Sequence, residues 1–218
     1  MLPDRGFCCH DRKKRQDREM TPGRETSSLP LPEFVKWSIF PFEGEFRVRR
    51  PKPHYPTDRP RTGEPGGPPC SACAAADDEY IWADRNWRVS ATRPSGVPVQ
   101  LFLETRAHVD MDDLDDQLAG ELGQMIVRLD RAIQAIGGIG RVHVARWGDG
   151  GSHFHMWFYA RPRGAGQLLG FCLPMWAMIL PPTPEQQWQA NVAVVAAELA
   201  KVSGTAIAKP QGEPAGDR

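Results

Sequence analysis

A glycine-rich turn that runs directly into an alternating strand constrains the fold of this chain more than any other stretch. Residues 147–159 read WGDGGSHFHMWFY, in which His153, His155, Trp157 and Tyr159 alternate with Phe154, Met156 and Phe158. Period two is the side-chain period of a β-strand, so both histidines are expected on one face. The phenylalanine and methionine face has the composition of a sheet face packed on a core. The histidine face is therefore the one expected to carry chemistry.

Other periodic stretches predict the rest of the fold. Apolar residues at spacings of three and four from Leu114 to Ile136 predict one long amphipathic helix, with Asp110 as its N-cap and Gly137-Gly138 as its end. An apolar stripe predicts a second helix over about 185–202. Short alternating stretches predict strands over 80–82, 87–90, 97–103, 141–146 and 153–159. Antiparallel strands with one central and one C-terminal helix indicate an α+β domain.

Proline and glycine divide the chain unevenly, and this predicts its organisation. We expect residues 1–30 to be a disordered tail, because they are polar, charged and without periodicity. Residues 31–55 predict an aromatic arm, a strand or hairpin that docks on the main domain. Residues 56–69 predict a poorly ordered Pro/Gly-rich connector, residues 70–203 the compact domain, and residues 204–218 a flexible C-terminus. The apolar segment 167–182 is expected either to pack in the core or to form a contact surface.

Charge and cysteine usage limit the classes of partner and compartment. The chain has 27 basic and 27 acidic residues, but residues 1–61 carry 14 of the basic and only 9 of the acidic ones. The compact part is therefore acidic, and we expect no nucleic-acid partner. No apolar signal follows Met1 and no apolar stretch is long enough to span a bilayer, so no membrane partner and a cytoplasmic location are expected. The five cysteines are then expected to be thiols or metal ligands.

A Cys-x-x-Cys pair, Cys70 and Cys73, is typical of half of a zinc site. A thioredoxin-like redox motif fits poorly, because a Pro-rich segment precedes the pair and a strand follows it. Unpaired surface thiols are the alternative. Among the six histidines, a set of Cys70, Cys73, His108 and one histidine of the pair 153 and 155 is the most consistent one. His143 lies mid-strand among valines, a position more often structural.

These motifs in this order resemble the histidine-triad superfamily, including its galactose-1-phosphate uridylyltransferase branch, over about residues 70–162. The resemblance implies a five-stranded antiparallel sheet, a nucleotide or nucleotide conjugate whose phosphate is held by the glycine turn, and a homodimer. It implies Zn²⁺ on Cys70, Cys73, His108 and His153. It also implies that His155 is the nucleophile that attacks phosphorus.

A nucleophilic imidazole would form a covalent nucleotidyl intermediate, and the phosphate charge would need hydrogen-bond donors. The donors expected here are the amides of Asp149, Gly150, Gly151 and Ser152, the Ser152 hydroxyl, and the side chain of Arg146 or Arg161.

The sequence departs from the family at the third triad position, where Trp157 stands instead of histidine or glutamine. An indole can donate one hydrogen bond but cannot shuttle a proton. Two hypotheses follow. The protein is a zinc-containing nucleotidyl hydrolase or transferase, or it is a catalytically degenerate nucleotide-binding or protein-interaction module with structural zinc.

Overall fold

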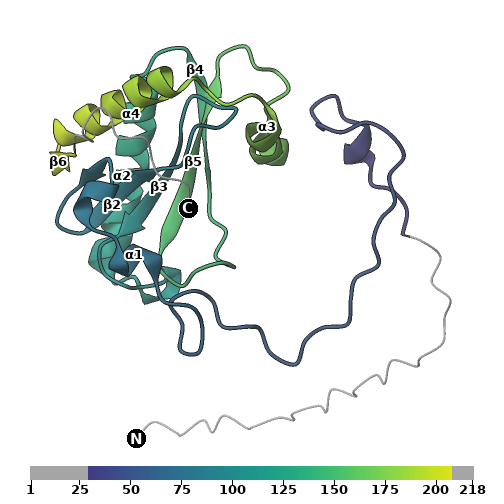
Figure 1. The fold of residues 1–218 in the computed structure, drawn as a ribbon, viewed down its shortest axis with the longest axis horizontal. Coiled ribbons are helices and arrows are strands. Elements are labelled where there is room, and N and C mark those ends of the chain that lie inside the picture. The colour runs from purple at the N-terminus through teal and green to yellow at the C-terminus, as the bar shows by residue number, and fades with distance from the viewer. Residues whose placement is uncertain (1–28, 208–218) are drawn as a thin grey trace, which may run out of the picture.

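The structure, a computed structural model, describes residues 29–207 (Figure 1). The tail predicted for residues 1–30 lies outside this range except for its last two residues. The C-terminus from residue 208 onward lies outside it as well.

A single antiparallel sheet of six strands forms the centre of the fold, in the order β4-β5-β3-β2-β1-β6. The strands are β1 (Trp82–Ala83), β2 (Trp87–Ala91), β3 (Gln100–Thr105), β4 (Ile139–Ala145), β5 (His155–Pro162) and β6 (Thr205–Ala206). The predicted α+β class with an antiparallel sheet is confirmed. The sixth strand comes from the segment predicted to be flexible, where Ala206 pairs with Trp82.

Four α-helices and four short 3-10 turns accompany the described strands. The helices are α1 (Ser71–Ala74), α2 (Asp116–Gln134), α3 (Leu173–Ile179) and α4 (Glu185–Ala200), and the turns are η1 (Glu33–Lys36), η2 (Asp77–Glu79), η3 (Met111–Asp113) and η4 (Gly170–Cys172). The long helix begins later than predicted. Its N-cap is Asp115, which accepts from the Leu118 amide at 2.8 Å, whereas Asp110 caps η3 by accepting from the Met111 amide at 2.6 Å. The prediction of Asp110 as the N-cap of the long helix is therefore wrong.

Helices α2 and α4 cover one face of the sheet and form the main core with it. Phe154 and Phe158 are fully buried in this core, and Met156 is 9% exposed. They meet Met125 and Leu129 of α2 there, together with Val195 and Leu199 of α4. The predicted alternation is thus confirmed, and the histidine-bearing side of β5 faces away from both long helices.

Helix α3 packs on that opposite side of the sheet (Figure 1). Tyr159 is only 4% exposed in a second core with Val97, Leu173 and Ala177. The histidine face is therefore open only at its first part, where His155 and Trp157 are half-buried. Part of the apolar segment 167–182 fills this core, as expected, while other residues, such as Phe171 and Met178, are exposed. A contact surface on this segment stays a prediction.

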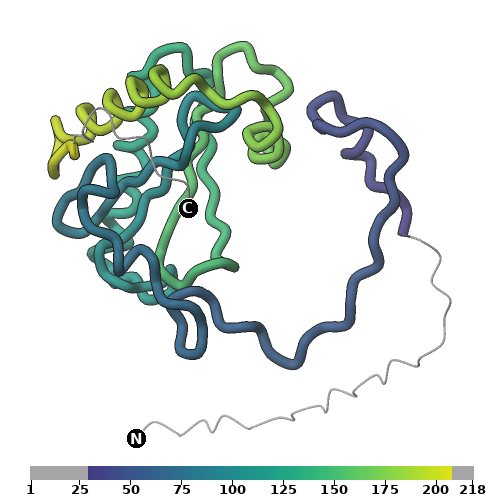
Figure 2. The backbone as a smooth tube through the Cα atoms, viewed as in Figure 1, coloured from purple at the N-terminus to yellow at the C-terminus, as the bar shows by residue number. Residues whose placement is uncertain are grey.

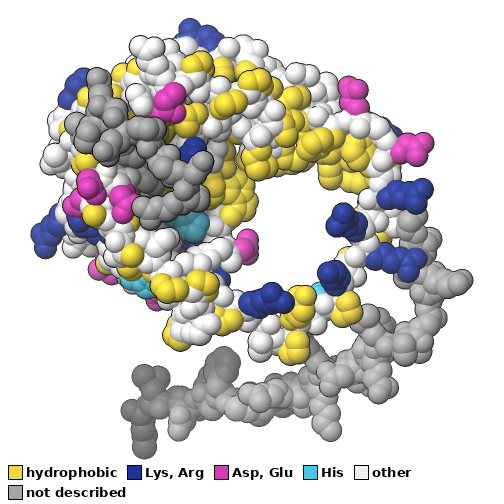
Figure 3. Space-filling model, in the orientation of Figure 1, with side chains coloured by type: hydrophobic (Ala, Val, Ile, Leu, Met, Phe, Trp, Pro, Cys, Tyr) yellow, Lys and Arg dark blue, Asp and Glu magenta, His cyan; other side chains and the backbone are white. Residues whose placement is uncertain are grey.

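The aromatic arm, residues 31–55, contains the single turn η1 and no strand, so the predicted strand or hairpin is wrong. It contacts α3 and η4: the Trp176 indole of α3 donates to the Ile39 carbonyl at 2.8 Å, and the ring centroids of Phe34 and of Phe171 in η4 lie 5.5 Å apart. From the arm the chain runs as an extended segment and returns to the sheet ahead of α1 (Figure 2). Lys and Arg side chains line this segment, and hydrophobic side chains gather on the surface it faces (Figure 3).

Among residues 29–207, none of the helices combines the length and the apolar character needed to cross a bilayer.

Candidate functional site

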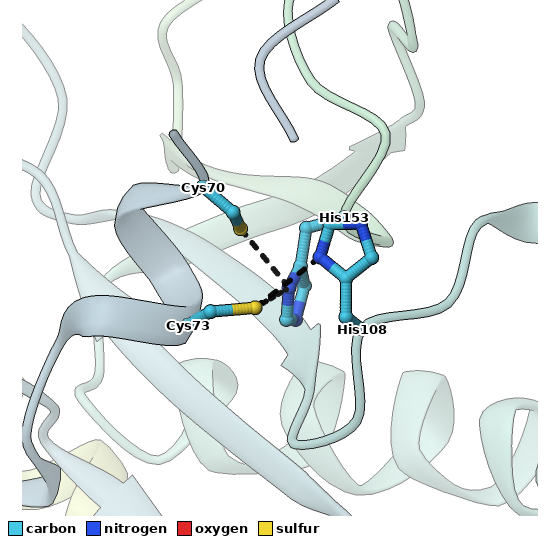
Figure 4. A group of neighbouring side chains, drawn as sticks. All are labelled: Cys70, Cys73, His108 and His153. Atoms are coloured by element: carbon cyan, nitrogen blue, oxygen red, sulfur yellow. Dashed lines mark hydrogen bonds between the residues drawn. The ribbon is translucent and has the colours of Figure 1, made fainter. Parts of the chain in front are cut away.

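Two cysteines and two histidines from distant parts of the chain converge at one end of the sheet (Figure 4). Cys70 is the N-cap of the short helix α1 and Cys73 lies within it, so both thiols point the same way. His108 follows β3, and His153 directly precedes β5. Their candidate ligand atoms all lie within 4.8 Å of one another.

The distances between these atoms fit a tetrahedral ion. Cys70 Sγ and Cys73 Sγ each lie 3.5 Å from His153 Nδ1, and Cys73 Sγ lies 3.2 Å from His108 Nδ1. With metal–sulfur bonds of about 2.3 Å and metal–nitrogen bonds of about 2.0 Å, a tetrahedral zinc separates sulfur from nitrogen by about 3.5 Å. The four side chains therefore suggest a closed metal site of the Cys2His2 type.

In both imidazoles, Nε2 contacts an oxygen outside the cluster while Nδ1 faces the cluster. His153 Nε2 lies 2.7 Å from the Thr105 carbonyl, which can only accept, so Nε2 carries the hydrogen and Nδ1 is the free ligand atom. His108 Nε2 lies 3.3 Å from Ser152 Oγ. Burial lowers the pKa of His153, which favours the neutral imidazole that binds a metal.

Residues 61–69, which we call the strap, connect the glycine turn to the two cysteines of the Cys2His2 cluster. Thr62 pairs with the turn: its amide donates to the Gly150 carbonyl at 3.1 Å, and its carbonyl accepts from the Ser152 amide at 3.0 Å. Gly63 has a φ of +92°, and a Cβ there would lie 2.6 Å from the His108 ring. A side chain is thus excluded on both grounds. The predicted loose connector is, in its second half, part of the site.

An ionic cluster fastens the strap at its other end. The Asp110 carboxylate, whose side chain is 10% exposed, binds Arg61 of the strap at 2.6 Å and also binds Arg146. Arg61 additionally donates to the Gly148 carbonyl at 3.0 Å. Burial alone would raise the pKa of Asp110, but the Met111 amide and the two arginines together hold it below its usual value. Asp110 is therefore the anion that joins the strap to the glycine turn.

The structure changes the role expected of Ser152. Its amide and its hydroxyl both donate to the Thr62 carbonyl, at 3.0 and 3.2 Å, while its oxygen faces His108. Ser152 is 7% exposed. It contacts His108 and the strap, so its amide and hydroxyl are not free for a phosphate as the sequence predicted. Within residues 29–207, the amides of Asp149, Gly150 and Gly151 have no hydrogen-bond acceptor.

His155 stands at the start of β5, half-buried on the face away from α2 and α4. Its Nδ1 lies 2.9 Å from the His153 carbonyl. A carbonyl only accepts, so Nδ1 carries the hydrogen and Nε2 keeps its lone pair. The two histidines thus differ in their contacts. The His153 side chain faces the two cysteines, and the His153 carbonyl fixes the tautomer of His155.

Aromatic rings surround His155 on its own face of the sheet. The Phe102 ring meets the His155 ring edge-on at 6.0 Å and lies 4.1 Å from Trp157. Trp157 stacks on Tyr159 at 5.8 Å, and Trp147 meets both edge-on. The Trp157 Nε1 is buried, and no acceptor for it lies among the described residues. At the third triad position, the Trp157 indole thus packs against the neighbouring aromatic rings.

The two arginines predicted to lend charge to a phosphate lie in different places. Arg146 is beside the glycine turn but is bound to Asp110. Arg161 lies six residues beyond His155 on the same strand, about 20 Å away at the rise of a β-strand. It lines a cavity of about 610 Å³ with Arg141 and Arg163. The prediction that Arg161 serves the same site as His155 is therefore wrong.

A second cavity of about 640 Å³ lies between the β1–β2 turn and α2, also away from His155. Neither of these two cavities is lined by His155 or by residues of the glycine turn. The sequence reasoning missed Arg61, Thr62 and Asp110 as parts of the site. A signal was present only for Asp110, whose capping role was assigned to the wrong helix.

No family model matches the chain, and no curated protein matches it. Solved structures do. The fold is similar to that of histidine-triad proteins. One from Bradyrhizobium japonicum has a TM-score of 0.46 and 21% identity over 55% of this chain and 89% of its own. A Zn-bound histidine triad family protein from Mycobacterium smegmatis has a TM-score of 0.40 and 19% identity over 56% of this chain and 84% of its own.

A uridylyltransferase is similar at a TM-score of 0.42 and 18% identity, over 61% of this chain. The match covers only 45% of that enzyme's length. At such identities no residue role is carried over, and each role proposed below rests on the geometry of this chain.

Proposed function

We propose that the protein is a zinc-containing, histidine-triad-like nucleotide hydrolase or nucleotidyltransferase that acts at a nucleotide α-phosphate through a covalent intermediate on His155. The observation that carries the proposal is the hydrogen bond of His155 Nδ1 to the His153 carbonyl at 2.9 Å. In the neutral ring this hydrogen bond places the hydrogen on Nδ1 and the lone pair on Nε2, four residues after the glycine turn. An imidazole held in this tautomer is an activated nucleophile.

The reaction would have two steps. Nε2 of His155 attacks phosphorus, the N–P bond forms, and the bond from phosphorus to the leaving group breaks. Water or a second acceptor then attacks the same phosphorus and breaks the N–P bond. The amides of Asp149, Gly150 and Gly151 would bind the phosphate oxygens, because they have no acceptor among the described residues and a Cβ at Gly150 would meet nothing within 4 Å.

The metal has a positioning role in this proposal. Zinc fits the donor set of two thiolates and two imidazoles and the sulfur–nitrogen distances of 3.2–3.5 Å. All four positions of a tetrahedral ion are taken by protein, which is the pattern of a structural site. When bound, the ion would fix His153, whose carbonyl orients His155, and His108, which contacts Ser152 beside the strap.

Turnover of adenosine phosphoramidate, diadenosine polyphosphates and sugar–nucleotide pairs tests this function. The wild-type protein should turn over at least one of them, and His155→Ala should lose at least a hundredfold in rate. His54→Ala is the matched control, because His54 is exposed on the extended segment. Absence of turnover of every substrate by the wild-type protein would sink the proposal.

A second function is favoured by Trp157, which packs against Phe102, Trp147 and Tyr159 in the space beside His155. Here the protein is a nucleotide-binding or protein-interaction module with structural zinc. Calorimetry distinguishes the two: micromolar binding of a nucleotide that survives His155→Ala, without hydrolysis, supports the module. A homodimer, implied by the resemblance, stays a prediction.

A further inference from the structure

The proposed reaction lacks a proton donor at position 157, where Trp157 stands in place of the histidine or glutamine of the superfamily that the sequence resembles. When the bond to the leaving group breaks, the departing atom needs a proton unless it is already a weak base. Trp157 cannot supply it, since an indole N–H does not exchange protons in this way and its Nε1 is buried. The donor has to be sought elsewhere on the same face of the sheet.

Glu104 lies directly across from His155 in the pairing of β3 with β5. Residues directly opposite each other in an antiparallel pair project to the same side, with Cβ atoms about 5 Å apart. Position 157, two residues along the strand from His155, is about 7 Å away. The Cβ atom of Glu104 is therefore at least as close to that of His155 as the Cβ atom of residue 157 is.

The surroundings of Glu104 do not neutralise it by an ion pair. Arg88 is its partner on the other side, on β2, but the Arg88 Nη atoms donate to the carbonyls of Ala75 and Arg106, and its guanidinium lies 4.6 Å from the Tyr80 ring. No salt bridge to Glu104 is present within residues 29–207. Three ionisable groups lie around the Glu104 carboxyl. They are Arg88 on β2, His155 on β5 and Tyr80 in the segment before β1.

Burial raises the pKa of Glu104, and this effect outweighs the hydrogen bond from Tyr80 and the charges of His155 and Arg88, which act in the opposite direction. The carboxyl consequently keeps its proton to a higher pH than an ordinary glutamate. A carboxyl of this kind, beside a nucleophile, has the properties of a general acid.

We propose that Glu104 is the general acid of this site and takes the role that position 157 cannot fill; the inference rests on the function proposed above. In the first step the N–P bond to His155 forms, the bond to the leaving group breaks, and the leaving atom takes the Glu104 proton. In the second step the carboxylate accepts a proton from the attacking water, the water oxygen bonds to phosphorus, and the N–P bond breaks. The nucleoside monophosphate leaves with Glu104 protonated again.

Glu104→Gln and two substrates of different leaving groups test the inference. Adenosine phosphoramidate releases ammonia, whose nitrogen needs a proton as it departs, whereas the p-nitrophenyl ester of AMP releases p-nitrophenolate, which does not. The variant should lose about 10²- to 10⁴-fold in kcat/KM on the phosphoramidate and less than tenfold on the ester. The fall in rate on the alkaline side of the pH profile should also disappear. Glu185→Gln, an exposed glutamate on α4, is the matched control.

The outcomes separate this inference from the function it rests on. Turnover of neither substrate by the wild-type protein contradicts both. Turnover of the ester alone by the wild-type protein keeps the His155 nucleophile and overturns the general acid. Equal losses on both substrates in Glu104→Gln, or no loss on either, overturn it as well. If Glu104→Gln does not fold, Glu104→Ala with added formate replaces it, and formate should restore phosphoramidate turnover only.

Discussion

Replacement of Asp110 by asparagine should destabilise the protein and release the glycine turn. Asp110 is the shared anion of Arg61 and Arg146, and its side chain is 10% exposed. Removing one partner of a buried ion pair costs about 3–5 kcal/mol. The arginine side chains are 29% and 26% exposed, so water compensates part of the loss. We expect a loss of about 2–3 kcal/mol in the free energy of unfolding for Asp110→Asn, or roughly 5–10 °C in Tm.

The pH dependence of this loss follows from the direction of the Asp110 pKa. The folded-state pKa lies below the ordinary value, so Asp110 contributes stability above the unfolded pKa of about 3.9 and loses it as the pH falls through the folded pKa. Denaturant unfolding should therefore show a full difference between Asp110→Asn and the wild type at pH 7 and a shrinking one below about pH 4.

A double-mutant cycle with Arg61→Ala assigns the effect to the strap. The two changes should be non-additive by at least 1 kcal/mol, since Arg61 and Asp110 share one contact. Amide exchange should also quicken at Ser152, whose amide donates to the strap residue Thr62. A destabilisation below about 0.5 kcal/mol at pH 7, the ordinary range of a surface substitution, would refute this account of the ionic cluster.

Three further outcomes are expected. Metal analysis of the purified protein should give about one equivalent of zinc, which Cys70→Ser loses and Cys172→Ala, a change at a buried cysteine outside the Cys2His2 cluster, retains; stoichiometric absence of metal contradicts the ligand set. Gly63→Ala should lower Tm by several degrees, because both φ and the His108 ring exclude a Cβ; an unchanged melting curve would show that the strap is not tightly packed. The folded-state pKa of Glu104 is raised, so the wild type should lose stability as the pH rises through that pKa, whereas Glu104→Gln should not. Parallel curves of Tm against pH for the two proteins argue against a raised pKa of Glu104.

Side-chain periodicity in the sequence predicts the strands and helices whose buried face can be read from neighbouring residues. The alternation of Phe154, Met156 and Phe158 is read from consecutive residues, and it places β5 against the main core. The long helix was predicted from its apolar spacing, although its N-terminus was set at Asp110 instead of Asp115. Two aspartates five residues apart can both cap a turn, and only the backbone geometry decides which one begins the helix.

Features that depend on long-range contacts could not be predicted from the sequence. The strap lies in a proline- and glycine-rich segment without periodicity, and its order comes from residues 50 to 90 positions away, such as Asp110 and Gly151. Glu104 becomes a neighbour of His155 only through the register of β3 with β5. Arg161 was predicted to lend charge to the phosphate, but the extended strand β5 carries it away from the glycine turn at about 3.3 Å per residue.

Mass-spectrometric mapping of a trapped intermediate tests the central claim most directly. The wild-type protein is mixed with adenosine phosphoramidate, or with the p-nitrophenyl ester of AMP, and quenched in base within one turnover. The account predicts an adenylyl group on His155, absent in His155→Ala and present in His54→Ala. Turnover without any adduct on His155, or an adduct on another residue, would contradict it.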